Sequence, residues 1–374
     1  MSHLGVENNS VLPTAANRLG LDYRAEAGRM SSAPVRIIDA HTHINGGEAA
    51  KVFLEAMDLY GIERTYSQTQ LAQADAVLNV LGDRIRFVAI PSYMDPDRER
   101  AHREGFLENI QLFHDRFGAR IVKFWAAPRW RDYWDAEEDH DVYGLESEWR
   151  IRAAELAQSL GMMLMAHVGD PDTWFATRYA DSGKYGTKAE QYEPFERMLD
   201  RFDSPWLAAH MGGWPEDLEF LSGLLSRHDN LYLDTSATKW MVRELSKHTR
   251  AALVSFFETW SGRVLFGTDI VTMDEHLLVT EPDPERTVAH LADSHESAFD
   301  LYASRYWAMR VLFETDYEGE SPIADPDLAM VEPERFDAMD APRLVGKSLG
   351  RPLLEVLYRG AAEGLFDRIE SSMS

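Results

Sequence analysis

The segment 35–43, with the sequence Val-Arg-Ile-Ile-Asp-Ala-His-Thr-His, is an apolar run that ends in two histidines separated by one residue. Successive side chains on a β-strand point to opposite faces, so we expect His41 and His43 to project to one side and Thr42 to the other. Their Cα atoms would lie about 6.5 Å apart, and both rings could then reach one ion at about 2.1 Å. The alternative is a pair of histidines that merely ends a buried strand.

Composition places the chain among globular proteins. Hydrophobic residues make up 45% and charged residues 27% of the 374 residues, which is ordinary for a protein with a large core. The length fits either two average domains or one large α/β barrel with extensions. The pattern of secondary structure must therefore decide the domain organisation.

The charge and the residue types narrow the partners. The formal net charge of -25 argues against nucleic acid or an anionic membrane as a partner. The chain has no cysteine, so a metal site must use His, Asp, Glu or a modified Lys. It shows neither a secretory signal nor the roughly 18 uninterrupted apolar residues of a membrane span. We therefore expect a cytoplasmic protein that does not enter the membrane.

Residues 1–33 show little periodicity and include Asn8-Asn9-Ser10 and Ser31-Ser32-Ala33-Pro34. They are expected to form an N-terminal arm or a loose tail. An arm that docks on a second subunit is the alternative, in which case the protein would be a homo-oligomer.

After residue 34, short apolar runs rich in β-branched residues alternate with amphipathic helical stretches. Eight strands are expected, at 35–41, 64–69, 85–91, 120–126, 162–168, 206–211, 231–236 and 264–269. Helices are expected between them, for example at 47–60, 98–117, 148–160, 215–227 and 241–260. Eight such units predict an α/β fold of the (β/α)8 TIM-barrel type over residues 34–374.

The region beyond the eighth strand is expected to extend this barrel. Residues 271–342 are polar and rich in Pro and Asp, with one aromatic helix candidate at 298–313, and we interpret them as an insertion. Residues 343–374 contain a helical stretch at 348–366 that is expected to close the domain against the barrel wall. The barrel therefore carries a C-terminal helical extension.

Candidate ligands recur at the ends of other strands, where (β/α)8 barrels carry their catalytic groups. His167 follows the fifth strand, His210 the sixth, Asp234 lies on the seventh, and Asp269 ends the eighth. From His41, the distance is 126 residues to His167 over four units, 169 to His210 over five and 228 to Asp269 over seven. Each quotient is about 32 to 34 residues, near the roughly 31 of an average barrel unit.

Each of these residues has a structural alternative when taken alone. A histidine at a strand end can be a hydrogen-bonded core residue, and Asp269 can cap the next helix. Together they place four imidazoles and a carboxylate at one rim, which favours a metal site. The histidines on helical or loop stretches, His102 and His228 among them, are expected to be solvated.

The order His41-x-His43, His167, His210, Asp269, in the contexts AHVGDP, AAHMGG, LYLDTSA and VLFGTD, resembles the amidohydrolase-related metal-dependent hydrolases (amidohydrolase family 2). This group includes enzymes like aminocarboxymuconate-semialdehyde decarboxylase. The resemblance covers about residues 35–366, and Ala361 stands where the family commonly has Asn. It implies that His41, His43, His167 and Asp269 bind one divalent ion, with His210 close to the bound water.

Three neutral imidazoles and a carboxylate suit Zn²⁺, with Mn²⁺ as the alternative. Water bound to zinc can have a pKa of about 7. Asp269 could take its proton and pass it to the leaving group, while His210 polarises the carbonyl. Asp39 is expected either to point inward below the metal or to be a buried carboxylate satisfied by backbone donors.

Substrate contacts are expected from strand four and from the loops after strands four and five. A carboxylated Lys123 could bridge two metal ions, as the resemblance to the superfamily suggests. Otherwise Lys123 could form an ion pair or bind a substrate carboxylate. An aromatic or carboxylated small molecule would suit aromatic faces beside an arginine. The alternative is that these side chains only pack the loops together. The candidates are Arg178, Trp174, Trp125, Arg129 and Lys123.

These residues predict a metal-dependent hydrolase that cleaves a C–N or C–O bond in a small carbonyl substrate. The first alternative is a metal-dependent, non-oxidative decarboxylase of a carboxylated substrate, which would use the same ligands. The second is a catalytically silent barrel that binds metal or a metabolite. His210 and Asp269 argue against it, because a mere binder has no need for them beside an open coordination position.

Overall fold

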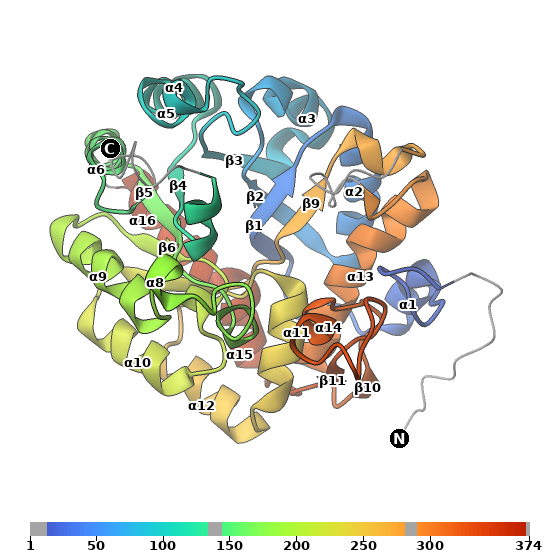
Figure 1. Ribbon diagram of the computed structural model, residues 1–374. Coiled ribbons are helices and arrows are strands. Elements are labelled where there is room, and N and C mark those ends of the chain that lie inside the picture. Colours follow the sequence, from blue (N-terminus) through green and yellow to red (C-terminus); the bar gives the residue numbers. More distant parts are fainter. Residues whose placement is uncertain (1–12, 134–143, 281–289, 372–374) are drawn as a thin grey trace.

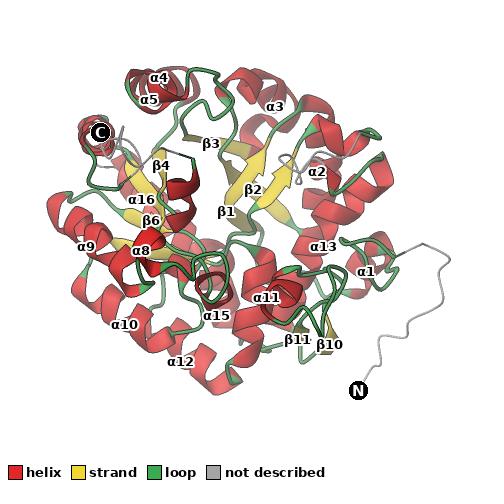
Figure 2. Ribbon diagram, viewed as in Figure 1, coloured by secondary structure: helices red, strands yellow, loops and turns green. Residues whose placement is uncertain are grey.

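A closed parallel sheet forms the centre of the computed structural model, which describes residues 13–133, 144–280 and 290–371 (Figure 1). Its strands follow the order β8-β7-β6-β5-β4-β3-β2-β1-β9. They are β1 (Ile37–Ile44), β2 (Ile62–Ser67), β3 (Ile85–Ala89), β4 (Ile121–Trp125), β5 (Met163–His167), β6 (Trp206–Ala208), β7 (Leu231–Asp234), β8 (Val264–Leu265) and β9 (Ile270–Thr272). Helices surround this sheet (Figure 2), and the predicted (β/α)8 barrel is confirmed.

The eighth barrel position is shared by two short strands. β8 pairs with β7, whereas β9 pairs with β1. Between them, Ala40 N donates to Phe266 O and Asp269 N donates to His41 O, both at 2.8 Å. The barrel is thus closed along a seam between its first and last strands, and Asp269 lies at the break.

The helices alternate with the strands as predicted, with additional short ones in the loops. They are α1 (Tyr23–Arg29), α2 (Gly47–Tyr60), α3 (Ala74–Leu81), α4 (Arg98–His102), α5 (Glu104–Phe117), α6 (Glu148–Ser159), α7 (Asp172–Phe175), α8 (Ser182–Tyr185), α9 (Tyr192–Arg201), α10 (Leu218–Arg227), α11 (Thr238–Lys247), α12 (Arg250–Thr259), α13 (His295–Glu314), α14 (Asp327–Val331), α15 (Arg351–Glu355) and α16 (Ala361–Ser371). Gly61 caps α2, and its φ of 79° lies in the left-handed region that favours glycine. The expected helices 98–117 and 241–260 are each two helices.

An extra residue in β1 sets the direction of the histidines. Asp39 pairs with Thr65 and Thr42 pairs with Ser67, so three steps on β1 match two on β2. Before this bulge, Ile38 and Ala40 belong to the cluster inside the barrel. Asp39 points the other way, toward α13, where Tyr306 OH donates to its Oδ2 at 3.1 Å. The expectation that Asp39 points inward is therefore wrong, because the simple alternation ignores the bulge.

The C-terminal helix closes the lower end of the barrel. α16 lies behind the strands in Figure 1 and packs Ala361, Leu365 and Phe366 against interior residues. The Phe366 ring stacks on Tyr66 with 3.9 Å between centroids. Ala361 is buried in this contact, so an apolar residue suits the position.

The two regions expected outside the barrel also contribute to it. α1 packs on α13, and Tyr60 OH donates to Tyr23 O at 2.9 Å, which ties residues 13–33 to the barrel wall; residues 1–12 lie outside the described residues. At the start of the region 271–342, β9 belongs to the sheet, and further on the largely buried α13 packs on α2. No helix within the described ranges is long and apolar enough to cross a membrane.

Candidate metal centre

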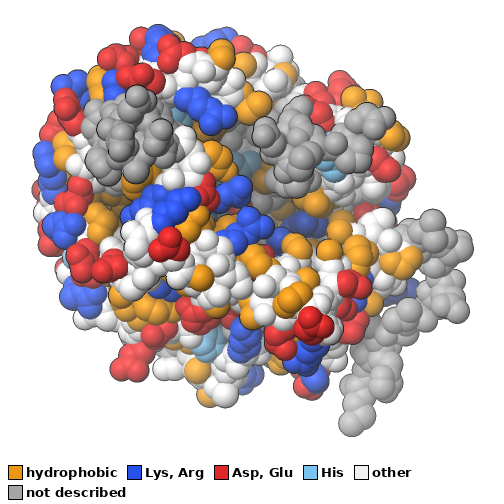
Figure 3. All heavy atoms as spheres, in the orientation of Figure 1, with side chains coloured by type: hydrophobic (Ala, Val, Ile, Leu, Met, Phe, Trp, Pro, Cys, Tyr) orange, Lys and Arg blue, Asp and Glu red, His pale blue; other side chains and the backbone are white. Residues whose placement is uncertain are grey.

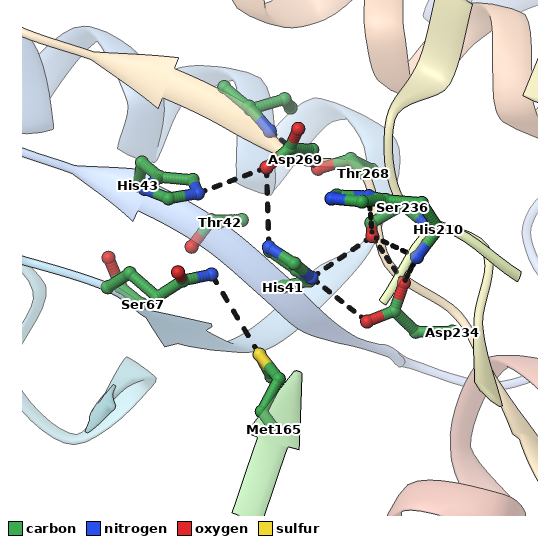
Figure 4. Close-up of polar contacts among 12 residues, drawn as sticks. His41, Thr42, His43, Ser67, Met165, His210, Asp234, Ser236, Thr268 and Asp269 are labelled. Atoms are coloured by element: carbon green, nitrogen blue, oxygen red, sulfur yellow. Dashed lines mark hydrogen bonds and ion pairs between the residues drawn. The ribbon is translucent and has the colours of Figure 1, made fainter. Parts of the chain in front are cut away.

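His41, His43 and Asp269 meet at the upper end of the barrel seam (Figure 4). Asp269 Oδ1 lies 3.1 Å from His43 Nε2 and 3.3 Å from His41 Nε2. As strand alternation predicts, Thr42 points away and its Oγ1 contacts Thr65 Oγ1 at 2.7 Å. His41 Nε2 is buried and has no hydrogen-bond partner among the described residues. An unsatisfied imidazole nitrogen beside a carboxylate fits a divalent cation at this position.

The backbone at the rim is held in uncommon conformations. Asp269 has a φ of 62° and His210 a φ of 60°, in the left-handed region that residues with a Cβ rarely adopt. Such strain is typical of functional sites. At Gly267, a Cβ would lie 3.1 Å from His41 Cβ and 3.3 Å from Ser236 Cβ. The sequence Gly267-Thr268-Asp269 thus lets the last strand approach His41 closely.

Asp234 and Ser236 support His41 from the side opposite to Asp269. Asp234 Oδ2 lies 2.9 Å and Ser236 Oγ lies 3.0 Å from His41 Nδ1. Burial raises the pKa of Asp234, but the neighbouring His41 outweighs it and holds that pKa well below its usual value. The ionised carboxylate accepts the proton of Nδ1, which leaves the lone pair on Nε2 for a metal. Its position near the end of the seventh strand marks Asp234 as a candidate, whereas its support of His41 emerges only from the fold.

His210 shares the same support. Its Nδ1 lies 2.8 Å from Ser236 Oγ, and its backbone N donates to Asp234 Oδ1 at 2.9 Å. Burial, followed by the charge of His167, lowers the pKa of His210 well below its usual value. The ring is therefore neutral at pH 7, with Nε2 left for a ligand in the cavity.

His167 lies beside this group but outside the tightest cluster. Its ring centroid is 4.5 Å from that of His210, and its Nε2 lies 2.8 Å from Asp170 Oδ1. Tyr179 OH in turn donates to Asp170 Oδ2 at 2.6 Å. The structure thus brings His167 to the same rim. Among the described residues, the ligand atoms that lie within 4.8 Å of one another form two groups, His41 with His43 and Asp269, and His41 with His210 and Asp234.

A cavity of about 420 Å³ opens above these residues. Lys123 and Trp125 line it, as do Trp240 of α11 and residues from the loop after β3. Figure 3 shows Lys and Arg side chains around the hollow in the middle of this face. The additional lining residues are Gln68, Ser92, Tyr93, Arg98, His102, Tyr133 and Trp240.

Three of the expected substrate residues are described by the structure but do not line this cavity. Arg178 is exposed and stacks over the Trp174 ring at 5.0 Å. Trp174 stands behind Trp240, with 5.9 Å between ring centroids. Arg129 lies over Tyr133 at 5.5 Å. The reason is the direction of the loops after β4 and β5, which pack these side chains against one another and outside the cavity.

Two further expectations concern titratable side chains that the structure buries. His102 and His228 are buried, not solvated. Burial and the charges of Arg150 and Arg98 lower the pKa of His102 to about 3. Lys123 is 3% exposed, and burial lowers its pKa to about 8.

Asp39 supports the rim from outside the barrel. It accepts hydrogen bonds from Thr268 N at 3.1 Å, Thr268 Oγ1 at 2.6 Å and His41 N at 3.2 Å. Burial raises its pKa to about 7 in spite of these donors. Asp39 therefore fixes the backbone of both strands at the seam.

This arrangement defines a class of protein. A closed (β/α)8 barrel that gathers histidines and a carboxylate at the carboxyl ends of its strands, below a cavity, is a metal-dependent barrel enzyme. The chain belongs to the amidohydrolase family, whose model matches residues 38–367. The resemblance noted in the sequence is thereby confirmed. No curated protein matches the chain.

Three solved structures illustrate what the chain is similar to. The 2,6-dihydroxybenzoate decarboxylase from Rhizobium is 12% identical, with 89% of this chain and 99% of that chain covered and a TM-score of 0.44. A dihydroxybenzoic acid decarboxylase from Polaromonas sp. JS666, with bound manganese and 2-nitroresorcinol, is 12% identical over 89% and 97%, with a TM-score of 0.45. The 5-carboxyvanillate decarboxylase from Novosphingobium aromaticivorans is 13% identical over 73% and 96%, with a TM-score of 0.38. The function of this chain must follow from its own residues.

Proposed function

We propose that this protein hydrolyses a C–N or C–O bond in a small carbonyl substrate that carries a planar, anionic group. One divalent ion would be held by His41, His43, His167 and Asp269, and this donor set favours zinc over manganese. The observation that carries the proposal is the position of Asp269 Oδ1, within 3.3 Å of both His41 and His43 and on the wall of the cavity.

The bound ion would supply Lewis-acid activation of water at neutral pH. Burial raises the pKa of Asp269, but the hydrogen bond from His43 and the other imidazoles outweigh it and hold that pKa well below its usual value. An ionised Asp269 can accept the proton of the attacking water and return it to the leaving group. His210, neutral and fixed by Ser236, would orient the scissile carbonyl.

The cavity supports an anionic, planar substrate. Lys123 is buried in its wall and Arg98 lies at the same cavity, whereas the whole chain has a net charge of -25. Cations inside an acidic protein focus the field on the cavity and attract anions to it. Trp125 and Trp240 add aromatic faces for a flat ring.

Lys123 is also the observation that favours decarboxylation as the second candidate. With a pKa of about 8, its amine is protonated at pH 7 and faces the cavity as an acid. A decarboxylase needs such an acid to protonate the carbon that loses CO2. Asp269, in contrast, is ionised and serves as a base, which is what hydrolysis requires.

The experiment is a screen of the zinc- and manganese-loaded protein in H2¹⁸O. Lactones, aromatic amides and aryl esters test hydrolysis, and hydroxybenzoates test decarboxylation. Hydrolysis places ¹⁸O in the acid product, whereas decarboxylation releases CO2 and no ¹⁸O-labelled acid. ¹⁸O incorporation supports the proposal, and CO2 release alone replaces it with the second candidate.

Paired variants separate the site from the rest of the protein. His210→Asn with Asp269→Asn should abolish turnover. The matched control carries the same changes at exposed positions, His295→Asn with Asp337→Asn, and should keep wild-type turnover. Turnover that survives the first pair would refute the assigned roles.

A further inference from the structure

A single carboxylate oxygen gathers three donors beside the metal centre. Asp327 Oδ2 accepts the indole N–H of Trp174 at 2.9 Å, the indole N–H of Trp240 at 3.1 Å and Nη1 of Arg243 at 3.2 Å. Asp327 is 6% exposed and Arg243 is 3% exposed. Charge-assisted hydrogen bonds in a buried place are strong and directional. This oxygen therefore fixes the orientation of two indoles.

Trp240 transmits this orientation to the metal centre. Its ring stands edge-on to His210, with 5.5 Å between centroids and 84° between planes. It is edge-on to His167 as well, at 6.3 Å and 78°. Trp240 also lines the cavity, and Trp174 packs behind it at 5.9 Å. A rotation of Trp240 would change the cavity wall and the space available to both imidazoles.

Asp327 itself is held by a network from several parts of the chain. Asp325 Oδ2 also accepts from Arg243 Nη1, and Asp327 N donates to Asp325 Oδ1 at 3.2 Å. Arg243 Nη2 donates to Thr173 Oγ1 at 3.1 Å, next to Trp174. The guanidinium thus connects α11, the loop after β5 and the segment that enters α14. Such a network specifies one arrangement, because a misplaced partner would leave a buried charge unpaired.

We infer that Asp327 is a positioning residue that holds Trp240 against His167 and His210 and so sets the shape of the substrate cavity. The inference rests on the proposed function for its kinetic consequence, but its structural part is independent of it. Asp327 does not reach the cavity and acts only through the two indoles.

The structural part is tested by NMR of the zinc-loaded, ¹⁵N-tryptophan-labelled protein. The chain has ten Trp indole N–H signals, and the Trp174→Phe and Trp240→Phe variants assign the two that are needed. Both of these signals should be protected from solvent exchange in the wild type. Asp327→Asn should move both signals and speed their exchange, whereas the exposed control Glu332→Gln should leave both in place. A Trp240 indole that exchanges as fast as an exposed one in the wild type overturns the inference, whether or not the Asp327→Asn protein folds.

The consequence for the cavity is tested by binding and kinetics. Asp327→Asn should weaken binding of the unreactive probe benzoate by about tenfold and raise KM more than it lowers kcat, because Trp240 forms part of the cavity wall and a displaced wall loses packing contacts with the bound molecule. In a Trp240→Phe background the same substitution should change benzoate binding less than twofold. An equal loss in both backgrounds overturns the inference, because Asp327 would then act without Trp240.

These outcomes are distinguishable from failure of the proposed function. If the indole signals and benzoate binding respond as expected but no substrate is hydrolysed, the positioning role stands and the hydrolase proposal falls. If hydrolysis is found but Asp327→Asn leaves both indoles and benzoate binding unchanged, this inference alone is overturned.

Discussion

Replacement of Asp234 by Asn is expected to cost metal affinity through the proton position on His41. In the wild type, Asp234 Oδ1 accepts from His210 N and Ser236 N, both at 2.9 Å, and from Ser236 Oγ. Two of these donors are backbone N–H groups, which cannot act as acceptors. The Asn carbonyl oxygen must therefore take the Oδ1 place, and its NH2 must face His41 Nδ1.

The magnitude follows from this geometry. An NH2 group opposite Nδ1 requires Nδ1 to accept, which moves the ring proton to Nε2, the nitrogen that faces Asp269 at 3.3 Å. Loss of a carboxylate behind a metal-bound histidine typically costs 10- to 100-fold in affinity. Because Asn also imposes the wrong tautomer, we expect the upper end, about 100-fold or about 2.7 kcal/mol.

The assay is zinc competition against a chromophoric chelator, with ¹⁵N imidazole shifts to report the tautomer of the apo protein. Asp58→Asn, at an exposed carboxylate on α2, is the control and should bind zinc as the wild type does. Thermal unfolding establishes that each variant is folded. A folded Asp234→Asn protein that binds zinc within threefold of the wild type would refute the reasoning.

Three other substitutions test separate parts of the structure. Gly267→Ala places a methyl group 3.1 Å from His41 Cβ, where buried neighbours cannot move apart, and should lower the free energy of unfolding in urea by about 1–3 kcal/mol. Lys123→Met should weaken benzoate binding at least about tenfold while binding of neutral benzamide changes little, because only the anion loses a buried charge partner. His102→Leu should make stability depend less on pH between pH 6.5 and 3. In the wild type, the pKa of His102 is about 3 in the folded protein and about 6.5 in the unfolded chain, so the unfolded chain binds the extra proton in this range. Stability of the wild type therefore falls as pH falls, by up to about 1.4 kcal/mol per pH unit from this group.

Matched substitutions at exposed positions accompany each of these. Gly364→Ala in α16 meets no atom within 4 Å and should not destabilise the protein. Lys51→Met should leave the ratio of benzoate to benzamide affinity unchanged. His295→Leu should leave the acid limb as it is in the wild type. A Gly267→Ala protein of wild-type stability, an unchanged affinity ratio in Lys123→Met or an unchanged acid limb in His102→Leu would each contradict the corresponding expectation.

The barrel and the principal residues of the rim were predictable because they obey regular spacings. His41 and His43 follow strand alternation, and His167, His210 and Asp269 recur with the period of the barrel unit. These periods follow from the regular geometry of strands and barrel units, so they can be recognised from the spacing of residues in the sequence.

What escaped prediction depends on irregular backbone and on loops. The bulge in β1 turns Asp39 outward, and no residue type marks it. The loops after β4 and β5 carry Arg129 and Arg178 away from the cavity, whereas the loop after β3 brings Arg98 and His102 to it. The direction of a loop is decided by packing between segments far apart in the chain, which a local pattern does not contain.

The seam of the barrel has a consequence for how the molecule unfolds. His43 belongs to the first strand, and Asp269 lies 226 residues later, between β8 and β9. An ion held by both would therefore act as a crosslink across the edge where the closed sheet can open. Such a crosslink would hold the two ends of a long loop together after the barrel has opened, and it would thereby lower the conformational entropy of the unfolding chain. Metal release would then come before the separation of β1 from β9, and the rate of unfolding would depend on the concentration of free metal.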